Sequence, residues 1–245
     1  MLLRDEPQPP LPAGPEGLQP KIMLFLSHAK VDGTVPAKSI RDYIYSQTQL
    51  AAFYDENDIP LGSVFGRVLQ SNLPATQTAA MIAVRSARYA SRPWCRRELA
   101  LFRRPVQEAP VAGKAEQWRL NPTVVVDALD DASQTLGIPE LGNSPLIRWS
   151  DKVSDQAEQI VTIVLRDALL GSLHASVGRT IASGPDCIVL NWLPDPTTLL
   201  HIPRVREKQD LRIVYPGRGL SGLELDILDE FFPNLSFQSF DQVSP

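Results

Sequence analysis

Short apolar runs alternate with longer amphipathic segments along most of the chain. The runs at residues 22–26, 50–54, 79–84 and 123–126 are continuous, a pattern typical of strands buried on both faces of a parallel sheet. A shorter run at 145–149 predicts a fifth strand. The apolar spacing between and after these runs predicts helices at 37–45, 64–73, 93–102 and 155–173. Strands that alternate with helices indicate an α/β fold, a five-stranded parallel sheet with helices on both faces.

The chain divides by composition into three parts. Residues 1–20 are rich in Pro, Gly and acidic side chains without periodicity, so we expect a flexible leader. Residues 21–174 carry the predicted five-stranded domain. Residues 175–245 hold further apolar runs and one amphipathic segment, which predict a C-terminal α/β extension of Rossmann-like type, the start of a truncated sensor domain.

A glycine pattern in the extension suggests one specific function. Gly217, Gly219 and Gly222 match G-x-G-x-x-G between a predicted strand and a predicted helix, and Asp241 follows at the distance of a ribose-binding acid. Pro216 and the Ser before Gly222 equally suit an ordinary loop that ends in a helix cap. Nucleotide binding and a plain turn therefore both stay open.

Composition and charge exclude several function classes. The chain has 245 residues, 43% hydrophobic and 21% charged, with a net charge of −4, so no nucleic acid partner is expected. No apolar stretch approaches about 18 residues and no signal peptide is visible, so we expect a cytoplasmic protein without membrane contact. Cys95 and Cys187 are too few for a disulfide framework and lack metal-ligand spacing with the three histidines, so no metal site is expected.

A lone acid follows the third predicted strand at the point where a helix begins. Trp94 and Glu98 lie four residues apart, so on a helix they share one face. Ligands of α/β sheets bind at the carboxyl ends of the strands, and this pair therefore predicts a cleft-edge site. Three simpler interpretations remain: the helix dipole alone favours Glu98, Trp94 can serve as a packing anchor, and His28 can bond to backbone.

Three stretches of the sequence stand at the ends of predicted strands. They are Phe25-Leu-Ser-His28 with Asp32, Phe53-Tyr-Asp55 running to Ile59-Pro-Leu-Gly62, and Trp94-Cys95 through Glu98. Together they resemble the Toll/interleukin-1 receptor (TIR) domain family, and the resemblance covers about residues 21–170. The Phe-Trp box of animal receptors is not visible, and Arg148-Trp149 is its nearest counterpart, which favours bacterial or plant-like members.

The resemblance implies a flavodoxin-like TIR fold and an NAD-cleaving activity. It implies that Glu98 is the catalytic residue and that Trp94 belongs to the binding wall. Ser27, His28 and Phe65 are the further candidates for contact with NAD+, which is a substrate here and not a cofactor. Cleavage of the nicotinamide–ribose bond passes through an oxocarbenium-like state, which a carboxylate stabilises and an aromatic wall shields from water.

Two functions follow from the resemblance. The first is an NAD+ glycohydrolase, the effector of a bacterial antiphage immune system that becomes active when a ligand drives self-association through the TIR domains. The C-terminal domain would sense a nucleotide second messenger. The alternative is a non-catalytic TIR scaffold or adaptor that acts through homotypic contacts and needs no carboxylate in the cleft.

Overall fold

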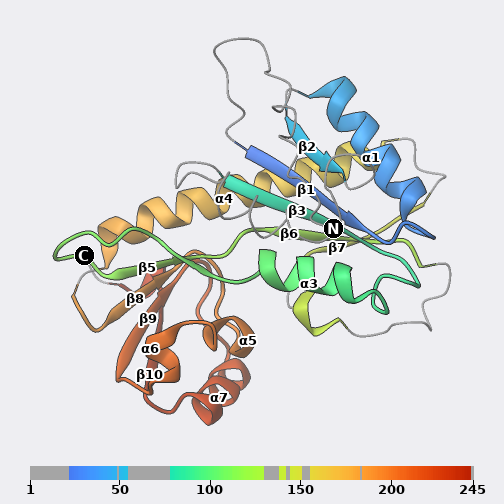
Figure 1. Ribbon diagram of the computed structural model, residues 1–245. Coiled ribbons are helices and arrows are strands. Elements are labelled where there is room, and N and C mark those ends of the chain that lie inside the picture. Colours follow the sequence, from blue (N-terminus) through green and yellow to red (C-terminus); the bar gives the residue numbers. More distant parts are fainter. Residues whose placement is uncertain are drawn as a thin grey trace, which may run out of the picture.

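The computed structural model describes residues 22–48, 50–54, 78–129, 138–141, 144–150, 155–182 and 184–243. Its strands form two five-stranded sheets, which confirms the predicted α/β class (Figure 1). Sheet A has the order β2-β1-β3-β6-β7, and every neighbouring pair is parallel. Its strands are β1 (Ile22–His28), β2 (Ala51–Tyr54), β3 (Thr78–Arg85), β6 (Thr123–Asp127) and β7 (Leu146–Arg148).

Helices cover both faces of sheet A, because successive strand side chains point to opposite sides. Leu24 and Leu26 of β1 face a core that includes residues of α1 (Thr34–Gln47) and α4 (Gln156–Ile181). Phe25 between them faces the opposite core, to which α3 (Pro93–Phe102) contributes. The short helix η2 (Pro139–Leu141) packs beside α3. The continuous apolar runs in the sequence reflect this burial on both faces.

Sheet B has the order β10-β9-β8-β5-β4, in which only the β4–β5 pair is antiparallel. Its core centres on β8 and β9, with Leu199 and Leu228 packing from the helices. The strands are β4 (Val106–Gln107), β5 (Glu116–Arg119), β8 (Cys187–Leu190), β9 (Leu211–Tyr215) and β10 (Leu235–Ser239). The helices are α5 (Pro196–Leu199), α6 (Pro203–Arg206), α7 (Gly222–Phe231) and η3 (Phe240–Gln242).

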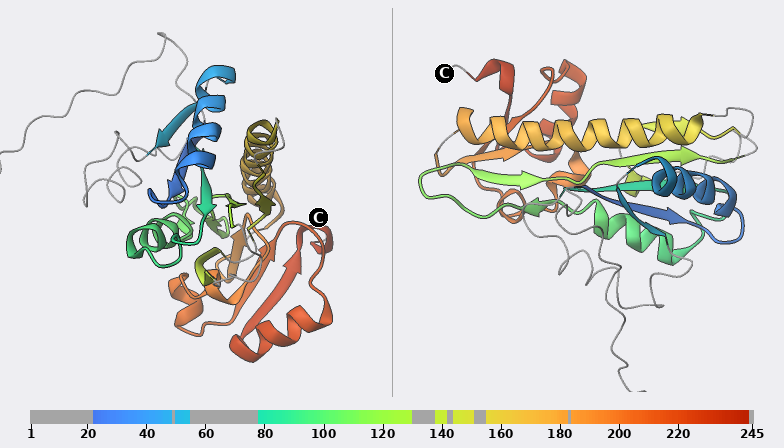
Figure 2. Two further views of the ribbon diagram at one scale, coloured as in Figure 1. Left: turned by 90° about the vertical axis from the view of Figure 1, so that its right-hand side faces the viewer. Right: turned by 90° about the horizontal axis from the view of Figure 1, so that it is seen from above.

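The two sheets are joined by continuous elements. The chain passes from β5 in sheet B directly into β6 in sheet A, and α4 runs along both sheets (Figure 2). A boundary at residue 174 falls inside α4, and β4 and β5 lie before it although they belong to sheet B. The expected leader at 1–20 and the expected helix at 64–73 lie outside the described residues.

Helix α4 is longer than the sequence predicts. It continues beyond residue 173 to Ile181 because its last turns pack on sheet B, where Gly178 is buried against Val189. By length and composition alone, α4 also satisfies the criterion for a membrane-spanning helix, which the search for apolar stretches in the sequence did not anticipate. In the fold, its buried side chains, such as Ile160 and Val164, lie in the core of sheet A.

Candidate functional site

The candidate site lies at the carboxyl edge of sheet A, where β1 and β3 end close to α3. Ser27 and His28 are the last two residues of β1, and Glu98 lies in the second turn of α3. All three side chains are buried, and only 7% of Glu98 is exposed. A carboxyl group loses most of its hydration at such a position, so its partners in the protein determine its orientation.

Glu98 is held by a chain of two side-chain hydrogen bonds. The Ser27 hydroxyl donates to Glu98 Oε2 over 2.8 Å, and Tyr89 OH lies 3.0 Å from Ser27 Oγ. Because the single Ser27 proton points to the carboxylate, Tyr89 must be the donor to Ser27. Burial raises the pKa of Tyr89 far above its ordinary value of 10, so the phenol keeps this proton. The chain of donors therefore runs from Tyr89 through Ser27 to Glu98.

Helix α3 is also attached to the end of β1 beside this chain. The Cys95 thiol lies 3.6 Å from the His28 carbonyl oxygen, and Cys95 is a free, buried cysteine. A cysteine at this position acts as a small apolar residue with a weak donor, which lets the helix approach the strand closely. His28 is thus placed next to α3 by its backbone, and its side chain is 4% exposed.

Asp32 connects the loops that follow β1 and β3. Its Oδ1 accepts a 2.6 Å hydrogen bond from the Ser86 hydroxyl, and its Oδ2 accepts a 2.8 Å bond from the Arg88 backbone N–H. Both bonds reach a segment three residues or fewer before Tyr89. The carboxylate of Asp32 thereby fixes the loop from which Tyr89 reaches Ser27.

Of the two aromatic residues expected to contact NAD+, the structure describes Trp94 but not Phe65. Trp94 is half-buried at the start of α3, one helical turn before Glu98. The Arg97 guanidinium lies 5.3 Å from the centre of the Trp94 ring, a cation–π distance. Phe65, like the expected loop at 55–62, lies outside the described residues. The structure therefore brings Ser27 and Glu98 into direct contact. His28 lies beside Ser27 on β1, and Trp94 lies on α3 with Glu98.

Two arginines near this edge are neutralised by acidic side chains. Arg85 at the end of β3 forms a 2.9 Å ion pair with Asp127 at the end of β6, and both side chains are largely buried. Arg96 on α3 pairs with Glu140. These contacts connect neighbouring strand ends and attach α3 to η2, so they are structural links around the site.

Sequence reasoning did not assign roles to Tyr89 or to the Asp32 clamp. Tyr89 belongs to the Tyr-Ala-Ser step of the matching segment, and Asp32 to the first matching stretch. Both were visible as parts of a motif. Their bonding partners lie 62 and 54 residues away in the sequence, and only the fold shows these contacts.

The glycine run of the extension forms a closed turn. Gly217 has φ +89°, a backbone conformation that favours glycine, and Ser221 begins α7 as a capping box with Glu224. Glu224 accepts hydrogen bonds from the Ser221 backbone N–H and hydroxyl, and its carboxylate pairs with Arg218. These contacts lower the pKa of Glu224 to about 2, the Arg218 bond contributing most. A carboxylate thus already occupies the helix N-terminus, where a bound phosphate would lie.

In the described part of the chain, no cluster of three or more His, Cys, Asp or Glu side chains is arranged to hold a metal ion. The site consequently offers a buried, oriented carboxylate at the carboxyl edge of a parallel α/β sheet, with an aromatic side chain one turn away. Comparison with protein families, with characterised proteins and with solved structures finds no match for the chain.

Proposed function

We propose that the chain is an NAD+ glycohydrolase that cleaves the nicotinamide–ribose bond, with Glu98 as its catalytic carboxylate. The observation that carries this proposal is the buried Glu98 carboxylate, which Ser27 holds at the carboxyl edge of sheet A. Counted along its own strands, sheet A has the order 2-1-3-4-5, which is that of flavodoxin-like sheets. This order and the three matching stretches support a flavodoxin-like TIR domain.

The proposed mechanism uses the negative charge of Glu98. As the bond to nicotinamide breaks, positive charge develops on the ribose, and a carboxylate with reduced hydration stabilises that charge strongly. Nicotinamide leaves as a neutral ring, so no strong general acid is needed, and water forms the new bond to the ribose carbon and releases a proton. The donors Ser27 and Tyr89 hold the carboxylate in one orientation. A group that is already oriented does not have to move as the charge forms, so no free energy of reorganisation adds to the barrier.

Trp94 would form the wall against which the substrate lies. Its ring is half-buried on the same helix as Glu98, and Arg97 stacks on it. An aromatic ring here offers a flat surface to nicotinamide or adenine. Ser27 and His28, at the end of β1, lie beside this helix. Self-association, an antiphage role and a nucleotide second messenger remain predictions that rest on the resemblance alone.

The decisive experiment removes the charge of Glu98 and keeps its shape. In Glu98→Gln the amide oxygen still accepts the Ser27 hydrogen bond, so folding should persist, whereas NAD+ loss should fall by about 100-fold or more. The assay incubates concentrated full-length protein with NAD+ and measures nicotinamide release by chromatography. Glu158→Gln, an exposed position on α4, is the matched control and should keep full activity.

Two results would contradict the proposal. If Glu98→Gln releases nicotinamide as fast as the unsubstituted chain, the catalytic assignment is wrong. If the unsubstituted protein consumes no NAD+ even when concentrated or crowded, the non-catalytic scaffold becomes the better interpretation.

A further inference from the structure

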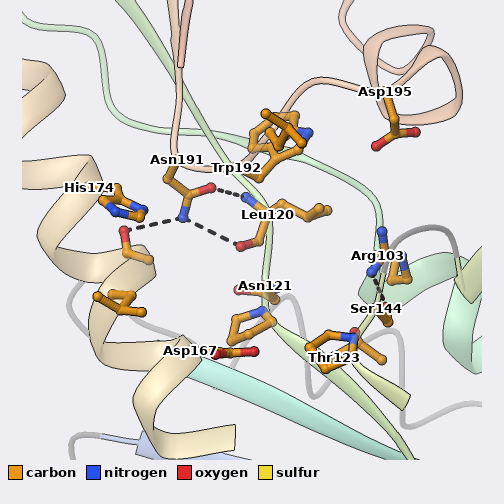
Figure 3. A pocket seen from close by; sticks show the side chains of 15 residues that line it. Arg103, Leu120, Asn121, Thr123, Ser144, Asp167, His174, Asn191, Trp192 and Asp195 are labelled. Atoms are coloured by element: carbon orange, nitrogen blue, oxygen red, sulfur yellow. Dashed lines mark hydrogen bonds between the residues drawn. The ribbon is translucent and has the colours of Figure 1, made fainter. Parts of the chain in front are cut away.

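A second site lies where the chain crosses from sheet B to sheet A. The crossing segment, from Leu120 to the first residue of β6, Thr123, forms one wall of a cavity of about 280 Å³ (Figure 3). Other walls come from α4, from the residue that ends α3 and from the loop after β8. The cavity is thus lined by elements of both sheets, is open to solvent and shares no lining residue with the Ser27–Glu98 contact.

The wall of this cavity is held in place by a buried amide. Asn191, 7% exposed, accepts a 2.8 Å hydrogen bond from the Leu120 backbone N–H, and its Nδ2 donates to the carbonyl oxygens of Leu120 and Gly171 over 3.4 Å. One side chain therefore connects the crossing segment, α4 and the end of β8, as Figure 3 shows. A satisfied buried network of this kind makes the walls rigid and keeps the cavity open.

Three charged side chains line the cavity: Arg103 and Asp195 on one side, and Asp167 on the other. Arg103 and Ser144 line one side, and Asp167 and His174 reach in from α4 on the other (Figure 3). The Arg103 guanidinium donates to the Ser144 hydroxyl over 2.6 Å. None of the ion pairs in the described ranges includes Arg103. Burial lowers the pKa of Arg103, because the charged form loses hydration there, while the nearby Asp195 carboxylate acts in the opposite direction.

The opposite side of the cavity attracts hydrogen-bond donors. Asp167 forms a 3.2 Å ion pair with Arg166, its neighbour in the sequence, whose side chain is exposed. On the crossing segment itself, Asn121 Oδ1 and Thr123 Oγ1 are buried and have no hydrogen-bond partner among the described residues. Between the two polar sides the surface is apolar and includes Leu170, Trp192 and Leu193.

We propose that this cavity binds a small dipolar molecule, with an anionic group beside Arg103, an amino group beside Asp167 and an apolar or planar body between them. Its volume of about 280 Å³ lies just below the usual range for drug-sized ligands, so it suits an amino acid or a mononucleotide better than a dinucleotide. A carboxylate or phosphate would make charge-assisted hydrogen bonds to the guanidinium and offset its loss of hydration. This site does not depend on the chemistry of Glu98.

Two probes distinguish the sources of this chemistry. L-phenylalanine offers a carboxylate, an ammonium and an apolar ring, and adenosine 5′-monophosphate offers a phosphate and the amino group of its base. Each is titrated into the full-length protein by calorimetry. We expect one of them to bind with a stoichiometry of 1:1, and the one that binds identifies the ligand class. If neither binds at concentrations up to about 10 mM, the proposal is overturned.

Substitutions then locate the bound probe. Arg103→Gln should weaken binding by about 10-fold or more, since it removes a charge-assisted contact, and Asp167→Asn should weaken it by a similar factor. Arg104→Gln, at the exposed neighbouring position outside the cavity, is the matched control and should bind normally. Circular dichroism checks that each variant is folded. Glu98→Gln should bind as tightly as the unsubstituted chain, which separates this site from the proposed NAD+ site. Binding that Arg103→Gln leaves unchanged would overturn the proposal.

Discussion

The Ser27 hydroxyl and the Glu98 carboxylate, 71 residues apart in the sequence, are joined by a buried 2.8 Å hydrogen bond. The bond connects the end of β1 to the second turn of α3 and fixes one carboxylate oxygen. Because a reacting carboxylate must keep its orientation while charge develops on the substrate, Ser27 is a positioning residue in the proposed reaction.

Ser27→Ala removes that orientation and leaves the charge of Glu98 in place. We expect kcat for NAD+ cleavage to fall by about 10–100-fold, while KM changes much less, because the single Ser27 proton is donated to Glu98 and is not available to NAD+. Steady-state kinetics of nicotinamide release measures both constants. Ser91→Ala, which removes an exposed hydroxyl in the next loop segment, is the control. An unchanged kcat in Ser27→Ala would show that Glu98 needs no such orientation.

Tyr89 predicts how stability depends on alkaline pH. Burial raises the pKa of Tyr89 far above 10 in the folded chain, whereas the unfolded chain releases the phenol proton near pH 10. Above this pH the unfolded state binds fewer protons than the folded state. The free energy of unfolding that Tyr89 contributes is therefore fully present below pH 10 and declines as the pH rises beyond it.

Tyr89→Phe tests this dependence. The variant should lose about 1 kcal/mol at neutral pH, since the hydrogen bond to Ser27 is gone, and its stability should decline less steeply above pH 10. Urea unfolding at a series of pH values measures both effects. Tyr45→Phe, at a residue on α1 that is 55% exposed, should keep the steep decline. Equal slopes for Tyr89→Phe and the unsubstituted chain would mean that another group carries the alkaline loss.

Asp32→Asn tests the clamp between the loops after β1 and β3. The amide oxygen can replace only one of the two carboxylate oxygens, and the amide nitrogen cannot accept the bond from the Arg88 N–H. We expect a loss of about 1–3 kcal/mol in the free energy of unfolding. Asp42→Asn on α1, an exposed position whose carboxylate pairs with its neighbour Arg41, should change stability by about 0.5 kcal/mol or less. Equal effects at the two positions would argue against the clamp.

The apolar pattern was enough to predict the strands of sheet A, of which β1, β3 and β6 are buried on both faces. It did not predict β4 and β5, since only Trp118 is buried in β5 and its other residues are partly exposed and polar. Strands of this kind are stabilised by pairing with β8, a contact between segments about 70 residues apart. The candidate site likewise has residues that the sequence predicted and residues that it did not. Glu98 and Ser27 stood at predictable ends of elements, whereas the part played by Tyr89 depends on how the loop after β3 folds.

The packing of α4 on sheet B gives the last prediction. A Cβ atom added at Gly178 would lie 2.4 Å from Val189 Cγ1, closer than side chains approach, so helix and strand would have to separate. Gly178→Ala should therefore lower the free energy of unfolding by about 1–3 kcal/mol, although alanine is otherwise the better helix former.

Gly222→Ala is the matched control, because nothing lies within 4 Å of an added Cβ at the first position of α7. Thermal and urea unfolding should find it neutral or stabilised by about 0.5–1 kcal/mol. The Gly222→Ala variant also tests whether Gly217, Gly219 and Gly222 form a dinucleotide fingerprint, because such a fingerprint uses its third glycine for close contact between helix and strand. A large destabilisation by Gly222→Ala would show a close contact at α7, and a neutral Gly178→Ala would show that α4 does not depend on sheet B beyond residue 173.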